Sequence, residues 1–462
     1  MGAIITLCVL GLVVLYLGLF KAKNALLPVT LLGLVVALGF LLAGWNSEAL
    51  PQFHGMVIFD RLALSFSILC VVITGLVILL SKEYFKNIST YLSEYFCLII
   101  FSLMGALLVN AYHNFAMLFI GIEVMSVALY ILVGIRKTDL ASNEAALKYF
   151  LMGAFSTGFL LFGITLLYGA SGTFDLTELQ AYVQTASEIS PLFYAGVLLL
   201  LCGLCFKVGA APFHFWTPDV YDGAPILITS FMSTVVKVAS FVGFLRLFGT
   251  VLIPLHDFWT PVLLTIIIIT LFVGNITALL QSSFKRMMAY SSISHAGYML
   301  FAIVSIGAMS ASGMLVYATA YSLASVIAFG VLILVKRSTG SENFESFNGL
   351  AKREPMLALI LTIAMLSLAG IPLTAGFMGK FMMFNNVMET YNITLLILAV
   401  INAAVGVYYY LHVVVNMYFR QPTGEEVTEQ RVPTSYKVVL VVAAVLTLII
   451  GVYPDSILKF FF

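Results

Sequence analysis

The sequence is dominated by apolar segments that are long enough to cross a lipid bilayer. A membrane-spanning helix needs about 20 consecutive, mostly apolar residues. Backbone polar groups inside a bilayer must be bonded within the protein, so such segments are expected to be helices. Two of the segments exceed thirty residues and contain proline and glycine. The fourteen predicted spans are 2–20, 25–44, 57–80, 93–111, 113–135, 143–169, 190–222, 225–249, 258–280, 285–307, 310–335, 355–387, 393–419 and 434–457.

The composition agrees with a chain that lies mostly in lipid. Hydrophobic residues make up 62% of it and charged residues 9%, whereas soluble domains are about a quarter charged. We therefore predict an all-α polytopic membrane protein with 14 transmembrane helices and lipid contacts. The net charge of +1 gives no reason to expect a nucleic-acid partner. The first apolar run has its lysines after it, which indicates a spanning helix rather than a cleavable signal peptide.

The basic residues outside the spans predict the orientation of the chain. Lysine and arginine are enriched in cytoplasmic connections. Fifteen of them lie in or beside the odd-numbered connections, and only three lie in the even-numbered connections and the two tails. We therefore expect the odd connections to be cytoplasmic and both termini to face the other side of the membrane. The three exceptions are Arg61, Arg246 and Lys459.

Several charged residues fall inside the predicted spans. Each would cost ~2.5–3.5 kcal/mol if it faced lipid at the centre of the bilayer. The lysines outnumber the single glutamate four to one, so ion pairing cannot neutralise all of them. A buried lysine without a charged partner releases its proton more readily, and we therefore predict a proton relay. Its candidate residues are Glu123, Lys148, Lys207, Lys237 and Lys380.

Two alternatives remain for these charges. They can be fixed ion pairs that hold helices together, and Lys148, near the end of its span, can instead extend to the membrane surface.

His295 lies in a serine-rich stretch of the tenth span and joins the relay, because histidine exchanges protons near neutral pH. A haem-ligand role for the histidines is a further alternative. The Cys202–Cys205 pair lies among leucines and is expected to act as two small apolar residues.

The two over-long spans carry similar interruptions. FKVGAAPFHFW (206–216) and GIPLTAGFMGKF (370–381) each combine proline, small residues and a lysine. Paired interruptions are typical of inverted-repeat transporters. We predict repeats formed by helices 4–8 and 9–13, with broken helices 7 and 12. Each break admits water beside its lysine; a simple kink is the alternative. The predicted parts are helices 1–3 (1–92), the two repeats (93–249 and 258–419) and a C-terminal loop and helix (420–462).

The segment FKVGAAPFHFWTPDVYDGAP (206–225) closely resembles the signature of the subunit N family of bacterial proton-translocating NADH-quinone oxidoreductase (respiratory complex I). GIPLTAGFMGKF is similar to the second broken helix of that family. The related subunits L and M look more like W-L-P-D-A at the first position. The resemblance implies an antiporter-like subunit in which Glu123 and Lys207 form a controlling pair and Lys237 is the central relay. It also implies that Lys380 is the exit-side residue and that Lys148 and His295 help proton transfer along the hydrated axis.

The resemblance further implies a bacterial inner-membrane location with periplasmic termini, and membership of a translocase complex. Neighbours would be other membrane-arm subunits, among them subunits M, K and J. Flavin mononucleotide, iron–sulphur clusters and quinone would be bound by other subunits, and no cofactor by this chain, which lacks a dinucleotide fingerprint. A subunit of a cation/proton antiporter or of a membrane-bound hydrogenase is the nearest alternative. A solute transporter and a structural scaffold are more distant ones.

Overall fold

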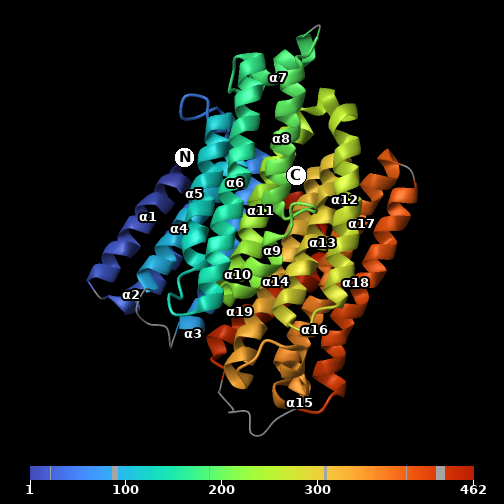
Figure 1. Cartoon of the computed structure of the whole chain (residues 1–462). Helices are drawn as coiled ribbons and strands as arrows, with labels where there is room; N and C mark the ends of the chain where they lie inside the picture. The colour runs from blue at the N-terminus through green and yellow to red at the C-terminus, as the bar shows by residue number, and fades with distance from the viewer. Residues whose placement is uncertain are drawn as a thin grey trace. The chain divides into compact units, whose positions relative to one another are not determined.

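The computed structural model describes residues 1–20, 22–85, 92–186, 188–305, 310–391, 393–422 and 432–461. These residues are almost entirely helical, and the only β-structure among them is a few isolated bridges. The all-α prediction is therefore confirmed (Figure 1). The longer helices are α1 (Gly2–Leu19), α2 (Lys23–Ala43), α3 (Arg61–Tyr84), α4 (Leu92–Ala111), α5 (Phe115–Val133), α6 (Leu140–Ser171), α8 (Pro191–Val208), α12 (His256–Leu279), α13 (Phe284–Val304), α14 (Ser310–Thr339), α16 (Pro355–Ala369), α17 (Ala375–Thr390), α18 (Ile393–Phe419) and α19 (Thr434–Val452).

Shorter helical segments lie between these helices. Two of them are π-helical, with one extra residue per turn relative to an α-helix. They lie on either side of α11. Together with α10 and α11 they form one continuous helical run over Ile226–Val251. The short segments are α7 (Leu176–Thr185), α9 (Trp216–Gly223), α10 (Ile226–Phe231), η2 (Met232–Val236), α11 (Lys237–Arg246), η3 (Leu247–Val251), η4 (Ile253–Leu255), η5 (Phe344–Phe347), α15 (Leu350–Arg353) and α20 (Asp455–Phe461).

Among the described residues, 13 helical runs are long and apolar enough to cross a membrane. The prediction of a multi-pass membrane protein is confirmed. The number 14 is not, because the expected span 355–387 is divided into α16 and α17 and neither helix reaches the length of a full crossing. The expected span 190–222 is likewise divided, into α8 and α9. Both interruptions fall where the sequence combines proline with small residues.

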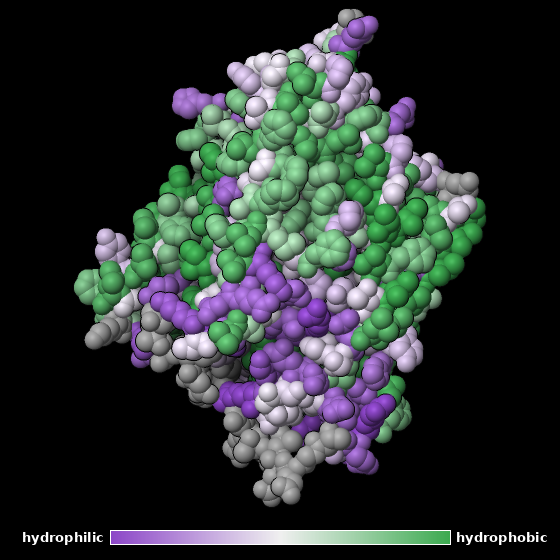
Figure 2. All heavy atoms as spheres, in the orientation of Figure 1, coloured by the Kyte–Doolittle hydropathy of each residue, from purple (hydrophilic) through white to green (hydrophobic). Residues whose placement is uncertain are grey.

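The first of two compact units comprises Met1–Gly75, Ile88–Trp216 and Val235–Ile267. In it α4 packs against α5 and α1, and α6 packs against α8 (Figure 1). Glycine allows the closest crossings. A methyl group added to Gly105 of α4 would lie 2.5 Å from the backbone nitrogen of Met125, and one on Gly163 of α6 would lie 2.9 Å from the Gly196 carbonyl. The outer face of α6 is largely hydrophobic (Figure 2), as a lipid or subunit contact requires.

The second unit comprises Leu76–Asn87, Thr217–Thr234 and Ile268–Phe462. Its central element is α14, which contacts α13, α16, α17 and α19. The most apolar stretch of α14 is completely buried. The tight approach of α17 to α16 depends on Gly376, where a methyl group would overlap the Ser367 carbonyl at 1.8 Å. The inferred repeats and domain limits stay predictions, since nothing described here tests them.

Candidate functional site

The first helix interruption is closed by specific hydrogen bonds. Helix α8 ends at Gly209, which has a left-handed φ of 74° and donates its backbone N–H to the carbonyls of Cys205 and Phe206. Glycine adopts this conformation without the steric cost that other residues bear. The indole nitrogen of Trp216 also donates to the Phe206 carbonyl, at 3.0 Å. The chain therefore leaves the helix at a defined point, two residues after Lys207.

Lys207 is buried, with 8% of its surface exposed. Its ammonium donates to the hydroxyl of Ser126 on α5 at 3.0 Å and to that of Thr157 on α6 at 3.5 Å. The Glu123 carboxylate acts on this ammonium electrostatically. Its Oε1 atom is buried and has no hydrogen-bond partner among the described residues. The structure thus brings Glu123 and Lys207 into one polar cluster, in which Lys207 is held by hydroxyl groups.

Lys148 lies in a different environment from the other predicted relay residues. Its ammonium is 2.8 Å from the carboxylate of Glu144, one turn earlier on α6, and 41% of its side chain is exposed. Lys148 therefore lies on the surface of α6 beside Glu144, and its part in the relay stays a prediction.

Lys237 is buried at the start of α11, directly after the π-helical residues Met232–Val236. Such π-helical turns are often found at functional sites. At the other end of α11, Arg246 is also buried, and it donates two hydrogen bonds to Asp60 at 2.7 and 2.9 Å and one to the Asn110 carbonyl. Arg246 is counted above among the basic residues of the connections. Its location inside the predicted span 225–249 is the signal in the sequence that it is buried.

The second interruption places a lysine on the end of a helix. Helix α16 ends at Gly370, which has a φ of 83°. The Lys380 ammonium donates to the carbonyls of Leu368 and Ala369, both at 3.0 Å. The last carbonyls of a helix have no acceptor role within it and carry partial negative charge, which favours a cation there. Lys380 also lies 5.1 Å from the centre of the Tyr298 ring.

His295 is buried in the second unit and contacts two tyrosines. Its Nδ1 atom is 2.6 Å from the hydroxyl of Tyr317 on α14, and its Nε2 atom is 2.9 Å from the hydroxyl of Tyr410 on α18. Both ring nitrogens are therefore engaged, which weighs against the haem-ligand alternative for His295. These tyrosines are not among the residues predicted from the sequence, because nothing in their spacing from one another or from His295 shows that they contact it.

A group of charged residues fixes α9 to the start of α13. The Lys285 ammonium is buried and donates to the carbonyls of Asp222 and Ala224 at 2.7 and 2.6 Å. The guanidinium of Arg286 lies 3.2 Å from the carboxylate of Asp219 and 3.6 Å from that of Asp222. The residues that follow the first interruption are thereby held in place by two neighbouring cations.

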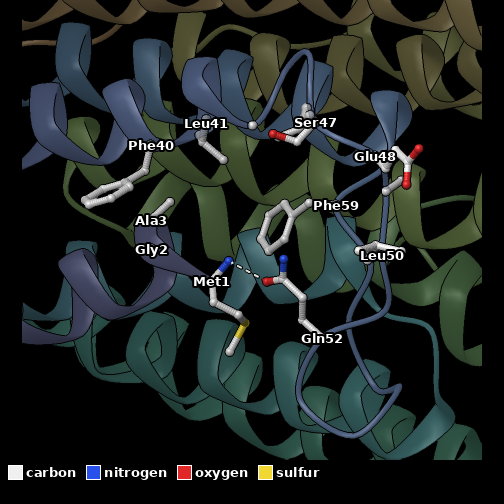
Figure 3. Close-up of a pocket in the computed structure, with 13 residues that line it drawn as sticks. Met1, Gly2, Ala3, Phe40, Leu41, Ser47, Glu48, Leu50, Gln52 and Phe59 are labelled. Atoms are coloured by element: carbon white, nitrogen blue, oxygen red, sulfur yellow. Dashed lines mark hydrogen bonds between the residues drawn. The ribbon is translucent and has the colours of Figure 1, made fainter.

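A pocket near the N-terminus contains none of the predicted relay residues. Figure 3 shows Met1, whose amino group donates to Gln52 at 2.9 Å, beside Leu41, Ser47 and Glu48. A second pocket is lined by polar residues of the α14–α15 connection, including Asn343, and also lacks them. The candidate functional residues are Lys207 and Lys237 in the first unit and His295 and Lys380 in the second unit, all of them buried.

Comparisons with known proteins identify relatives of this chain. The family described as "NADH:quinone oxidoreductase/Mrp antiporter, TM" matches residues 112–406. NADH-quinone oxidoreductase subunit N of Flavobacterium psychrophilum is 38% identical over 460 residues, which cover 99% of this chain and 100% of the relative. Subunit N of Trichlorobacter lovleyi is 40% identical over 461 residues, 99% of this chain and 94% of the relative.

Solved structures extend the similarity to the fold. A chain of respiratory complex I from Thermus thermophilus with bound Aureothin is 33% identical, with a TM-score of 0.85 and coverage of 99% of this chain and 98% of that one. A chain of the Mrp complex from a Dietzia species has a TM-score of 0.88 over 100% and 96% of the two chains, at 16% identity, which shows a shared fold. The resemblance seen in the first interrupted helix is thus confirmed over the full length, and the chain belongs to the NADH:quinone oxidoreductase/Mrp antiporter transmembrane family.

Proposed function

We propose that this chain is the antiporter-like subunit N of the membrane arm of NADH-quinone oxidoreductase, and that it couples NADH:quinone electron transfer to proton translocation. It acts as part of a translocase in a bacterial inner membrane, with both termini periplasmic. Its neighbours are other membrane-arm subunits, including M, K and J. Flavin mononucleotide, iron–sulphur clusters and quinone are bound by other subunits of the complex.

This proposal is supported by the chemical nature of the groups that accept hydrogen bonds from the buried lysines. Lys207 is held by two hydroxyls and Lys380 by two backbone carbonyls. Neutral acceptors bond both the protonated and the unprotonated amine, because either form still carries N–H donors. A carboxylate at the same distance would favour the protonated form strongly. Lysines on neutral acceptors are therefore suited to gain and release protons.

The proposed mechanism is electrostatic. While Glu123 stays close to Lys207, it stabilises the protonated amine. Movement of Glu123 away from Lys207, driven by a charge in a neighbouring subunit, releases that proton toward Lys237 and then Lys380. His295 contributes along the path, and Lys148 contributes from the surface of α6. Moving one charge against 100 mV costs ~2.3 kcal/mol, which equals about a 50-fold change in proton affinity.

The second candidate function is a subunit of a multisubunit cation/proton antiporter or a membrane-bound hydrogenase. The fold shared with the Mrp complex supports it. The two functions differ in what co-purifies with the chain. A complex that contains flavin and iron–sulphur clusters and oxidises NADH supports the first, whereas sodium-dependent proton exchange without NADH oxidation supports the second.

The test of the relay is Lys237→Ala in the intact complex in membrane vesicles. We expect the number of protons translocated per NADH oxidised to fall while the assembled complex still oxidises NADH. Lys352→Ala is the matched control, since the Lys352 side chain is exposed and its ammonium donates to the side chain of Gln421. Lys237→Arg covers the case in which the alanine variant does not assemble. An assembled Lys237→Ala complex with the parental proton ratio would contradict the proposal.

A further inference from the structure

His295 is held between two hydroxyl groups that come from different helices. Tyr317 of α14 contacts Nδ1 and Tyr410 of α18 contacts Nε2, and all three side chains are buried. The helices α13, α14 and α18 can be followed in Figure 1. A buried histidine needs a partner for each ring nitrogen, and one carboxylate or carbonyl at one of them is the common arrangement. Here both partners are tyrosine hydroxyls.

The hydrogen bonds continue past Tyr410. Its hydroxyl also contacts the Ser291 hydroxyl, one turn before His295 on α13. Tyr317, His295, Tyr410 and Ser291 thus form an unbroken chain of four groups, all of them buried. Every link in the chain joins two groups that can both donate and accept.

Because of this property, the direction of every hydrogen bond in the four-group chain can be reversed. A hydroxyl donates one proton and accepts others, and a neutral imidazole has one donor and one acceptor nitrogen. In one arrangement Tyr317 donates to Nδ1 and the Nε2–H group donates to Tyr410. In the other arrangement every donor is reversed and the proton is on Nδ1. The same heavy-atom positions accommodate both.

We propose that Tyr317, His295, Tyr410 and Ser291 form a proton wire within this subunit, in which the two tyrosines carry protons to and from the imidazole. This inference rests on the proposed function. A proton that reaches the Tyr317 oxygen displaces the hydroxyl proton to Nδ1, and the Nε2 proton moves to Tyr410. The Tyr410 proton moves to Ser291, whose own proton passes to the next acceptor of the proposed relay. One proton enters and one leaves, and the imidazole changes tautomer without retaining charge.

The wire lies beside the lysine of the second interruption. Gly379, the residue before Lys380, packs so closely on Tyr317 that an added methyl group would lie 2.5 Å from the ring and 2.7 Å from the Cα atom of Tyr317. Lys380 itself lies against the ring of Tyr298, one turn after His295 on α13. A movement of α17 that changes Lys380 is therefore transmitted directly to Tyr317.

A buried tyrosine of α19 offers a matched control. Tyr436 lies in the same unit as the four groups and is 2% exposed. Its hydroxyl donates to the backbone carbonyl of Gly330 on α14, at 2.9 Å. Replacing Tyr436 by phenylalanine removes one buried hydroxyl that belongs to none of the links in the four-group chain.

The experiment compares Tyr317→Phe, Tyr410→Phe and Tyr436→Phe in the intact complex in sealed vesicles, with Lys237→Ala as reference. NADH oxidation and proton translocation are measured on the same vesicles. We expect the Tyr317 and Tyr410 variants to lower the proton ratio to the value of Lys237→Ala, and the Tyr436 variant to keep the parental ratio. Parental ratios in both wire variants would overturn the inference.

Two further arms separate the possible failures. If Lys237→Ala and His295→Gln lower the ratio while the tyrosine variants do not, the wire is wrong and the proposed function stands. If Lys237→Ala also keeps the ratio, the proposed function itself fails.

For a variant that does not assemble, 3,5-difluorotyrosine at the same position keeps the ring and hydroxyl but makes the hydroxyl more acidic. It should shift the pH profile of translocation at positions 317 and 410 and leave it unchanged at 436, and an unshifted profile at 317 and 410 would overturn the wire.

Discussion

The side chain of Lys380 lies directly against the backbone of Gly370. A methyl group added to Gly370 would lie 2.8 Å from Cδ and 3.3 Å from Nζ of Lys380. Gly370 also has a φ of 83°, which disfavours any residue with a Cβ atom. This one glycine therefore ends α16 and at the same time leaves room for the lysine that bonds its last carbonyls.

Replacing Gly370 by alanine is expected to impair proton translocation as well as stability. The left-handed backbone costs about 1–2 kcal/mol for a residue with a Cβ atom, and the added methyl group displaces Lys380. Gly172→Ala is the control, since Gly172 has a φ of 75° and nothing within 4 Å of an added Cβ. Thermal denaturation of the purified complex should show similar losses for both variants, and only Gly370→Ala should lower the proton ratio. Equal ratios in the two variants would count against a role for the position of Lys380.

Removing the hydroxyl of Ser126 is expected to weaken the site of Lys207. This hydroxyl accepts the shortest hydrogen bond of the ammonium, and hydrogen bonds to charged groups contribute ~1.5–3 kcal/mol. Ser126→Ala should therefore slow translocation by about tenfold or more. Ser171→Ala is a suitable comparison, because among the described residues the Ser171 hydroxyl bonds only backbone groups near the end of α6. Translocation rates at a fixed rate of NADH oxidation provide the measurement, and no difference between the two variants would rule out this contribution.

The buried pair of Arg246 and Asp60 is expected to stabilise the first unit. Truncating one member of a buried ion pair costs ~3–5 kcal/mol because the other is left without a partner. We expect about 3 kcal/mol for Arg246→Met, since 35% of the Asp60 side chain is exposed and water compensates part of the loss. The exposed pair of Lys459 and Asp455 should contribute ~0–1 kcal/mol. Heat inactivation of the Arg246→Met and Lys459→Met variants compares the two, and a stable Arg246→Met protein would refute the prediction.

The crossing of α6 and α8 is expected to tolerate no side chain at Gly163. A Cβ atom there would lie 2.9 Å from the Gly196 carbonyl and 3.0 Å from the Leu200 backbone nitrogen. Overpacking a close-packed core commonly costs ~1–3 kcal/mol, so Gly163→Leu should reduce the amount of assembled complex. Gly158→Leu, on the same helix with nothing within 4 Å, should assemble normally. Blue native electrophoresis of membranes distinguishes the two outcomes.

Much of the fold could be predicted from local sequence. Hydropathy summed over about 20 residues decides whether a segment prefers lipid, so the all-α multi-pass architecture followed from the chain alone. The interruptions near Gly209 and Gly370 were also predictable, because proline and glycine act on the backbone at their own position. The burial of Lys207, Lys237 and Lys380 followed from their place within apolar segments.

Only the tertiary structure decided which atoms these residues meet. The hydroxyl acceptors of Lys207 and the tyrosines around His295 come from other helices. The carbonyl acceptors of Lys380 come from the end of the preceding helix. Lys148 also lies within an apolar segment, but its side chain is on the exposed side of α6. Hydropathy reports that a helix is in the membrane but not how it is rotated about its axis. The rotation depends on packing against neighbours, and close packing is a property of the folded molecule.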